Sequence, residues 1–436
     1  MNKMVDAQAY ISSRKRFGIK PGLLRTQLLL DALGNPEAKI RFIHVAGTNG
    51  KGSTCVYLAS VLEHAGYRVG LYTSPELNSF SDRMMINGEE ISEHEIVQFT
   101  MEIKRVLDVD VALLEDPPTE FEVTTALSFL YFAAHEVDLV VLEAGLGGRY
   151  DATNVVTPMV CAITNVSYDH MDVLGTSLEE IAYDKAGIIK QGIPIVTGAR
   201  TPALGVIESI AQQALAPCFV YGRDFYAVTE ETYETRGQRF SYFGIGRDWY
   251  GVSLKMVGLH QVDNAAVALG VLEVLQQGGE IRATDRDIRG GFSRSVWRGR
   301  LEVVSQSPIV LLDGAHNPAG AMALAEALGS IGLVSYILVT GVLKDKDIRG
   351  ILQQVVSGAK HVIATAPGVA RAADPSFVAD VAREYVQHDT VVEVVTGVAQ
   401  AVQRAMMLAK DDGKDVGVCV MGSLYTVAEA RRALLN

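Results

Sequence analysis

Short runs of apolar residues recur along the first part of the chain, and between them lie longer segments in which apolar residues return at helical spacing. The runs predict strands and the spaced segments predict helices. The expected strands are 42–46, 68–72, 138–143, 159–164 and 193–198, and the expected helices include 52–64 and 119–135. Runs of branched apolar residues are typical of parallel strands buried on both faces. The pattern therefore predicts an α/β fold with a mostly parallel sheet flanked by helices.

Two later regions follow different patterns. Residues 218–254 alternate polar and aromatic positions and contain glycine turn signals, which predicts a β-rich lobe attached to the first sheet. From residue 309, strands and helices alternate, and this order predicts a smaller, parallel, Rossmann-like domain. The strands are expected at 309–312, 336–341, 361–364, 391–395 and 416–420, with helices at 318–331, 348–356, 374–385, 399–409 and 423–434. No G-x-G-x-x-G motif is present, so there is no reason to invoke NAD.

Local signals define several boundaries. Asn87-Gly88 predicts a tight turn, and Ser92 with Glu95 predicts a capping box at the start of a helix. The glycines and proline of 17–22 predict a loop between two short helices. The helical pattern stops near residues 293–300, which predicts one domain over residues 1–296 and a second over residues 297–436.

Composition supports this organisation and narrows the function. The chain has 436 residues, 48% of them hydrophobic, enough for two or three cores. A net charge of −12 without a long basic block argues against nucleic-acid or anionic-membrane binding. The four cysteines are scattered, and no run of about 18 apolar residues occurs. We therefore expect free thiols, no membrane span and no export signal, in a cytoplasmic protein that acts as a monomer.

The chemistry centres on residues 47–54, a glycine-rich turn that follows an apolar run and precedes a helical segment. Backbone N–H groups in such a turn converge on phosphate oxygens, and the helix dipole favours the anion. Lys51 supplies a positive charge, and Ser53 or Thr54 can offer a hydroxyl to Mg²⁺. This predicts a site for ATP or GTP. The candidate nucleotide-binding residues here are Gly47, Thr48, Asn49, Gly50, Lys51, Gly52, Ser53 and Thr54.

The turn departs from the general P-loop spacing G-x-x-x-x-G-K-[ST]. Val45 stands where that spacing has glycine, and Gly52 stands where a hydroxyl residue would follow the lysine. It is therefore a shortened variant. The alternative is a glycine-rich connection with an incidental lysine.

Three further residues are candidates for metal or catalytic chemistry. Glu143 ends an apolar strand, where a Walker-B carboxylate would stand. His170 lies in a polar loop, which favours a ligand or catalytic role over packing. Lys185 lies in a helix otherwise patterned for burial, although a lone lysine there would usually extend to solvent.

The variant G-T-N-G-K-G-S resembles the nucleotide loop of the Mur ligase superfamily, and its G-S ending resembles the folylpolyglutamate and dihydrofolate synthase branch. Further similarities occur in the same order along nearly the whole chain. They lie at 17–25, 73–92, 165–190, 258–269, 297–300, 313–318 and 421–425. Departures occur at Leu24, Glu76, Asp82 and Arg298.

The resemblance implies a set of site residues. A serine, Ser74, and a histidine, His170, would bind metal, and Lys185 would carry a carbamate derived from CO₂. Asn264 would contact the adenine. Arg300 would reach the phosphates, and Asp313 would contact the nucleotide. His316 would join the residues that bind ATP. The expected ligands of two Mg²⁺ ions are Ser53, Ser74, Glu143, His170 and Lys185. The residues expected at the acceptor pocket are Arg25, Glu76, Phe80 and Arg83.

The function implied by this resemblance is an ATP-dependent amide ligase. The carboxylate of a folate or pteroate would take the γ-phosphoryl group, and the amine of L-glutamate would attack the resulting acyl phosphate. Lys51, His170 and Lys185 would be the catalytic residues. Two alternatives stay open: a related Mur-type ligase that joins a different acid to an amino acid, and a P-loop ATPase that acts as a switch.

Overall fold

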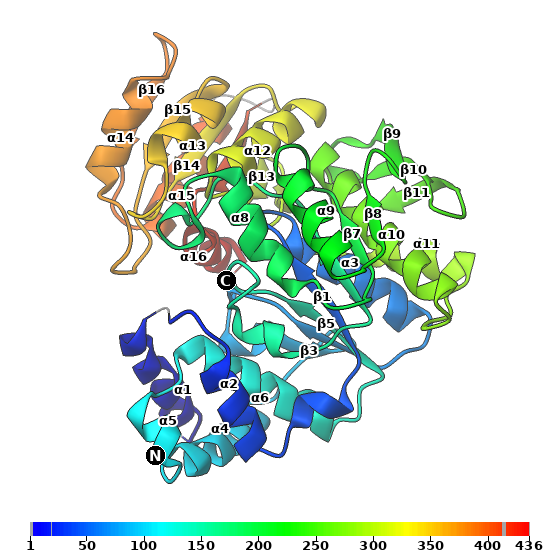
Figure 1. Cartoon of the computed structure of the whole chain (residues 1–436). Coiled ribbons are helices and arrows are strands. Elements are labelled where there is room, and N and C mark those ends of the chain that lie inside the picture. The colour runs from blue at the N-terminus through cyan, green and yellow to red at the C-terminus, as the bar shows by residue number, and fades with distance from the viewer. Residues whose placement is uncertain (1–2, 19, 412–415, 436) are drawn as a thin grey trace.

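The larger sheet has eight strands in the order β4-β3-β2-β5-β1-β6-β7-β8 (Figure 1). The computed structural model describes residues 3–18, 20–411 and 416–435, so Ile19 of the expected loop at 17–22 lies outside the described residues. The strands are β1 Phe42–Ala46, β2 Val69–Tyr72, β3 Met84–Ile86, β4 Glu89–Glu90, β5 Leu139–Glu143, β6 Val160–Ile163, β7 Ile195–Thr197 and β8 Cys218–Val220. Strand β3 pairs antiparallel with both β2 and β4, and the other described strand pairs of this sheet are parallel, which confirms the mostly parallel sheet.

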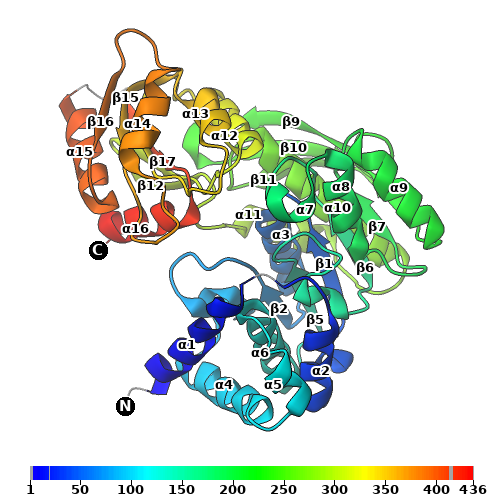
Figure 2. The ribbon, with the colours of Figure 1, turned by 60° about the vertical axis from the view of Figure 1, so that its left-hand side comes forward.

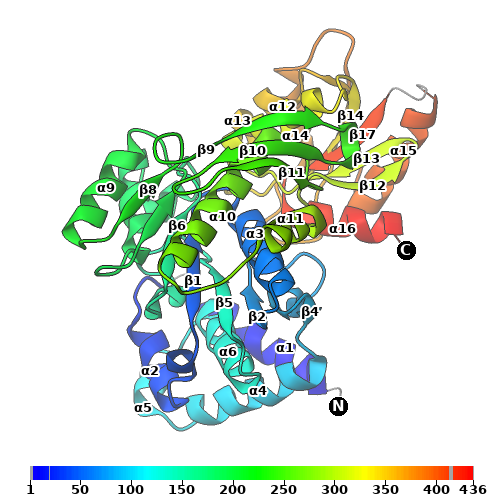
Figure 3. The same cartoon turned by 90° about the vertical axis from the view of Figure 1, so that its right-hand side faces the viewer.

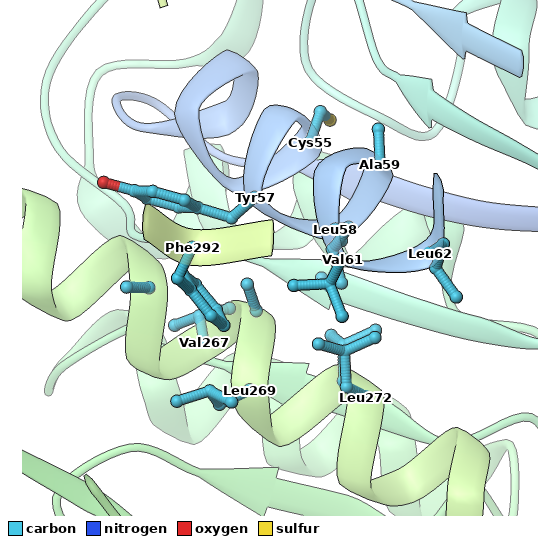
Figure 4. Packing of buried hydrophobic residues seen from close by; sticks show 14 of the residues in the cluster. Cys55, Tyr57, Leu58, Ala59, Val61, Leu62, Val267, Leu269, Leu272 and Phe292 are labelled. Carbon is cyan, nitrogen blue, oxygen red and sulfur yellow. The ribbon is translucent and has the colours of Figure 1, made fainter. Parts of the chain in front are cut away.

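Helices cover both faces of this sheet. They are α1 Lys3–Ser13, α2 Leu24–Ala32, α3 Lys51–His64, α4 Glu93–Leu107, α5 Val111–Glu115, α6 Glu120–Ala134, α7 Met171–Leu174, α8 Leu178–Lys185, α9 Ala203–Gln213, α10 Leu259–Gln277 and α11 Asp285–Arg294. Because side chains alternate along β1, Ile43 and Val45 join the core beneath α3 and α10, whereas Phe42 joins the core beneath α6. Figure 4 shows α3 and α10 meeting through Leu58, Val61, Val267 and Leu272.

The β-rich lobe is a three-stranded antiparallel sheet of β9 Tyr226–Thr232, β10 Gln238–Phe243 and β11 Trp249–Leu254. The lobe lies against α10 and α11 (Figure 3). Its inner face, with Phe240, Tyr242 and Trp249, packs into the same core as these helices. The lobe begins later than predicted, since β8 pairs in parallel with β7 and extends the first sheet. The prediction that assigned residues 218–220 to the lobe was therefore wrong.

The second half contains a six-stranded sheet in the order β12-β13-β17-β14-β15-β16, flanked by helices (Figure 2). The strands are β12 Glu302–Gln306, β13 Ile309–Leu312, β14 Tyr336–Thr340, β15 Ala359–Ala364, β16 Val391–Val394 and β17 Gly417–Met421, and the helices are α12 Pro318–Ser330, α13 Ile348–Val355, α14 Pro375–Arg383, α15 Val398–Asp411 and α16 Leu424–Leu435. Strand β12 was missed. It pairs antiparallel with β13 at the sheet edge, so the strict parallel alternation does not hold. Its side chains are only half-buried, which explains its weak apolar pattern.

The local signals form as expected. Asn87 and Gly88 both have positive φ, at 48° and 77°, in the turn between β3 and β4. Ser92 accepts the N–H of Glu95, whose carboxylate accepts the N–H of Ser92, at the start of α4. Thr119 caps α6 in the same way. Such a cap contributes about 1 kcal/mol.

Two predictions drawn from composition have structural counterparts. All four cysteines are free thiols, and three of them are buried. In the described part of the chain, every helix is too short or too polar to cross a membrane. The domain boundary predicted at residues 296 and 297 stays a prediction.

Candidate active site

A cavity of about 680 Å³ opens at the carboxyl ends of β1, β5 and β6 and is lined by both halves of the chain. This edge collects ligand-binding loops in parallel sheets, because every strand delivers its following loop there. Predicted residues on its wall are Gly47 to Ser53, Ser74, Arg83, Glu143, His170, Lys185, Asn264, Arg300, Asp313 and His316. Arg25, Thr54, Glu76 and Phe80 lie outside this wall.

The glycine-rich turn follows β1 and leads into α3, as the sequence predicted. Gly47 and Gly50 have φ of 150° and 81°, and a Cβ at Gly50 would stand 2.1 Å from Asn264 Oδ1. Gly52 is needed for a different reason, because a Cβ there would stand 2.7 Å from Trp297 Nε1. Gly52, which stands where the general P-loop has a hydroxyl residue, therefore leaves room for the indole of Trp297, a residue distant in the sequence.

The polar side chains of the turn point in different directions. Lys51 Nζ donates to the carbonyls of Gly47 and Thr48, at 3.1 and 3.3 Å. Ser53 lies on the cavity wall. Thr54 is fully buried beneath it, and its hydroxyl is directed at the Asn264 carbonyl at 3.5 Å. Of the two hydroxyls considered for Mg²⁺, the structure places only Ser53 at the cavity.

Glu143 ends β5 at the cavity, where its carboxylate accepts the Ser74 N–H at 3.2 Å. The side chain is almost fully buried, so desolvation raises its pKa, while the charge of Lys51 acts in the opposite direction. Among the described residues it has no ion-pair partner. A buried carboxylate of this kind is stabilised by a bound cation.

Lys185, at the end of α8, is 2% exposed, and its Nζ donates to the Gly47 carbonyl at 3.0 Å. Lys185 does not follow the usual tendency of a lone lysine to extend to solvent, because its side chain points inward beneath the P-loop. Desolvation, together with the nearby Lys51 charge, lowers its pKa to about 7. A substantial fraction of the amine is therefore neutral near physiological pH.

His170 is the residue before α7 and has a φ of 50°. Its Nε2 lies 3.1 Å from Lys346 Nζ, and Lys346 also pairs with Asp169 at 2.6 Å. Burial lowers the pKa of His170 to about 4, so its ring is neutral at physiological pH. Asp169 also accepts from Asn317 and faces His316. Burial raises the pKa of Asp169, but the hydrogen bond and charge of His316, together with Lys346, hold that pKa well below its usual range. Both halves of the chain meet at this cluster.

The expected metal ligands fit Mg²⁺ in part. Ser53, Ser74 and Glu143 supply the hard oxygen donors that Mg²⁺ prefers, and the carboxyl group of Glu143 is buried. His170, the expected ligand of a second ion, is already in contact with the Lys346 ammonium. The described residues contain no group of three or more His, Cys, Asp or Glu side chains arranged to hold a metal. A second ion would therefore require an additional oxygen donor, such as a carbamate at Lys185, and displacement of Lys346.

Asp313 and Arg300 come from the second half. Both Asp313 oxygens are occupied by backbone donors, the N–H groups of Leu301 and Ala315 at 2.8 Å. Asp313 thereby holds the loops on which Arg300 and His316 lie, while it also borders the cavity. His316 Nδ1 donates to the Gly314 carbonyl at 2.8 Å, which leaves Nε2 directed at Asp169.

The expected acceptor residues form ion pairs. Arg25 pairs with Glu122 and Asp116, and Arg83 pairs with Glu76. The Phe80 ring lies 5.7 Å from the Arg83 guanidinium. Of the four expected residues only Arg83 lines the cavity, so Arg25, Glu76 and Phe80 act, at most, behind this wall.

Sequence reasoning missed several wall residues: Asp151, Asn165, Asp169 and Lys346, together with Asn317, which bonds to Asp169. Asp169 is next to His170 in the sequence, and Asp151 follows the glycine cluster after β5, so the sequence contained a signal that both lie at the site. Lys346 offered none. It reaches Asp169 across 177 positions of sequence.

Comparison with known proteins places these features in a family. Residues 45–272 match the Mur ligase middle domain, and residues 299–424 match the Mur ligase glutamate ligase domain. Dihydrofolate synthase/folylpolyglutamate synthase of Bacillus subtilis is 42% identical over 353 residues, which cover 80% of this chain and 82% of the relative.

Solved structures show the same architecture. Folylpolyglutamate synthase of Mycobacterium tuberculosis complexed with ADP has a TM-score of 0.92 at 32% identity, covering 100% of this chain and 98% of that chain. FolC of Escherichia coli in complex with DHPP and ADP has a TM-score of 0.87 at 30% identity, covering 98% of this chain and 97% of that chain.

Proposed function

The chain belongs to the folylpolyglutamate synthase and dihydrofolate synthase family of Mur ligases, and we propose on that premise that it joins L-glutamate to the carboxylate of a folate or pteroate at the expense of ATP. The observation that carries the proposal is the shared cavity. It brings the P-loop and Lys51 from the first half together with Arg300, His316 and Lys346 from the second. A cavity of about 680 Å³ has the size typical of small-molecule sites.

The P-loop holds the phosphates of ATP in this proposal. Backbone N–H groups at the start of α3 would donate to phosphate oxygens, and the ammonium of Lys51 would compensate phosphoryl charge. Arg300 contributes a guanidinium from the opposite wall, and Asn264 lies against Gly50 where the base would extend. The relatives in complex with ADP support this assignment.

Ser53, Ser74 and Glu143 would hold Mg²⁺, which supplies charge neutralisation between the phosphates when it is bound. We propose that Lys185 becomes a carbamate. Only the neutral amine reacts with CO₂, and burial has lowered its pKa to about 7. The product would exchange a cation beside the P-loop for an oxygen donor. His170, neutral and at the cavity wall, would complete this side of the site.

The reaction then needs two substitutions. A carboxylate oxygen of the acceptor attacks the γ-phosphorus and ADP leaves, which forms an acyl phosphate. The amine of L-glutamate, after loss of a proton, attacks the acyl carbon, and phosphate leaves as the amide forms. Carboxylates are poor electrophiles, so ATP supplies a leaving group. The protein's task is to align the groups and neutralise charge. No residue has to act as a covalent nucleophile.

The acceptor would enter beside Arg83 and Lys20, on the side of the cavity that faces α6. Glu76 introduces a negative charge near this wall, and its pairing with Arg83 compensates that charge. Both walls of the cavity come from one chain, which supports a monomer as the active form.

One experiment tests the proposal. The purified protein receives ATP, Mg²⁺ and L-glutamate with dihydropteroate, with tetrahydrofolate or with neither, while phosphate release and product mass are followed. We expect phosphate release that depends on a pterin and a mass increase of one glutamate. Release that ignores both pterins but responds to another carboxylic acid would assign the protein to a related ligase, and release without any acid would indicate an ATPase.

A further inference from the structure

His44 lies in the middle of β1, with its side chain on the face of the sheet that carries Phe42 and Ala46. It is fully buried, and its four neighbours along the strand are apolar. Burial, with Lys190 nearby, lowers the pKa of His44 to about 3, so the ring is neutral. The strand continues directly into the P-loop.

Only one of the two His44 ring nitrogens is hydrogen-bonded within the described part of the chain. Nε2 lies 2.8 Å from Thr153 Oγ1, whereas Nδ1 is buried and has no hydrogen-bond partner among the described residues. An unsatisfied buried nitrogen destabilises the folded state, and an apolar residue would avoid that cost. Polar groups that break local packing rules in this way are concentrated at functional sites. The contact with Thr153 is therefore the feature that explains a histidine here.

Thr153 continues the chain of hydrogen bonds toward the cavity. Its hydroxyl donates to Asp151 Oδ1 at 2.5 Å, and the same oxygen accepts the Thr153 N–H at 3.0 Å. Thr153 Oγ1 then accepts from His44, which requires the proton of the ring on Nε2. The three residues form a directed chain from the centre of the sheet to Asp151, on the cavity wall.

Asp151 in turn holds the loop that follows β5. Its Oδ2 accepts the Leu146 N–H at 2.8 Å, and its own N–H donates to the Gly148 carbonyl. This loop passes between Glu143 at the end of β5 and Lys185 on α8, where a Cβ at Gly148 would stand 2.7 Å from the Lys185 carbonyl. The orientation of Asp151 therefore sets the path of the loop between two proposed ligands.

We propose that His44 and Thr153 are positioning residues for the ligase reaction: they orient the Asp151 carboxylate and, through it, the loop of residues 145–148 between Glu143 and Lys185. The effect on catalysis rests on the proposed function. The hydrogen-bond chain itself does not, and it can be measured without any substrate.

The first test measures the hydrogen-bond chain of His44, Thr153 and Asp151 directly. Selective ¹⁵N labelling of the nine histidines gives few enough signals to assign His44 by its loss in His44→Gln. We expect a protonated Nε2 and an unprotonated Nδ1, and a change of the Nε2–H resonance in Thr153→Val but not in Thr153→Ser. A ring protonated at Nδ1, or a resonance unaffected by Thr153→Val, would overturn the proposal.

The second test reads catalysis. Thr153→Val should lower kcat about tenfold, the effect typical of removing a supporting partner, with the KM for ATP and the affinity for ADP unchanged. Thr153→Ser and His44→Gln, which keep a donor or hydroxyl, should stay within about threefold of the wild type. His44→Leu should match Thr153→Val, and the double variant should be no worse, because both break one chain.

The control is Thr100→Val, since Thr100 is equally buried, its hydroxyl has no hydrogen-bond partner among the described residues, and it lies outside the cavity wall. We expect no loss of kcat there. Additive losses in the double variant, or a loss in Thr153→Val that Thr153→Ser does not restore, would show separate packing roles and contradict the proposal. A wild type without glutamate ligation would refute the proposed function, while the tautomer measurement would still decide the His44 contact.

Discussion

The positive side chains on the two sides of the cavity differ in whether they form ion pairs. On the P-loop side, Lys51 donates to backbone carbonyls, and neither Lys51 nor Arg300 forms an ion pair within the described chain. On the acceptor side, Lys20 and Arg25 pair with Asp116, and Arg83 pairs with Glu76. The P-loop side therefore keeps its positive charge available, and the acceptor side has already neutralised most of its own.

This difference indicates what each side is suited to bind. A triphosphate carries several negative charges and needs cations whose charge is not already compensated. An acceptor with one reacting carboxylate needs orientation more than charge, and paired arginines are held in fixed positions by their carboxylates. Substitutions on each side, and at the contact between the halves, separate these roles.

The largest effect is expected for Lys51→Ala on the P-loop side. Removing this cation should reduce ligation by a factor on the order of 1,000, because charge compensation at the phosphates is lost. Phosphate release measures the loss, and thermal unfolding checks that the fold remains. Activity near that of the wild type in the folded variant would remove Lys51 from the ATP site.

Glu143→Gln and His170→Ala should each reduce activity by about 100-fold or raise the Mg²⁺ concentration required, because each removes a proposed ligand. A titration of activity with Mg²⁺ measures both effects. Glu63→Gln is the matched control, because Glu63 lies on α3 outside the cavity wall. Unchanged titrations in both site variants would contradict the metal assignment.

Asp169→Asn tests the contact between the halves. The pKa of Asp169 is held below its usual range, so its ionised form stabilises the fold above the unfolded pKa of about 4, and this stabilisation is lost as pH falls below that value. We expect the variant to lose about 3 kcal/mol at pH 7, since Lys346 remains buried without its partner. Urea unfolding at pH 7 and pH 3.5 should show the difference shrinking in acid.

The exposed pair Arg383 and Asp380 supplies the control for this experiment. Asp380→Asn should change stability by less than about 0.5 kcal/mol. A loss of similar size in both variants, or a loss in Asp169→Asn that is the same at both pH values, would show that the charge of Asp169 does not link the halves.

The smallest effect is expected on the acceptor side. Glu76→His should lower the KM for an anionic pterin by a few-fold, because Arg83 loses its carboxylate partner while a polar ring remains. Steady-state kinetics with varied acceptor measure this change. Glu93→His, at an exposed position on α4, is the control. A raised KM would mean that Glu76 orients Arg83 instead of competing with the substrate.

Local patterns predicted most of the elements correctly. The helix starting at the P-loop, the turn at Asn87 and the capping box at Ser92 depend on neighbours within a few residues, so their signals are complete in the sequence. Strand β12 was not predicted, because an edge strand buries little side-chain surface and therefore shows little apolar pattern. Thr54 could not be separated from Ser53 by pattern, because only the rotation of α3 decides which hydroxyl faces the cavity.

By itself, the sequence determined the α/β elements, the glycine positions that the P-loop requires and the family to which these motifs belong. Only the tertiary structure decided that Lys185 is buried beneath Gly47, that Glu76 pairs with Arg83 and that Lys346 reaches Asp169. The physical reason is distance. Backbone conformation is set largely by adjacent residues, whereas desolvation and charge pairing depend on atoms that folding brings within a few ångströms from segments far apart in the chain.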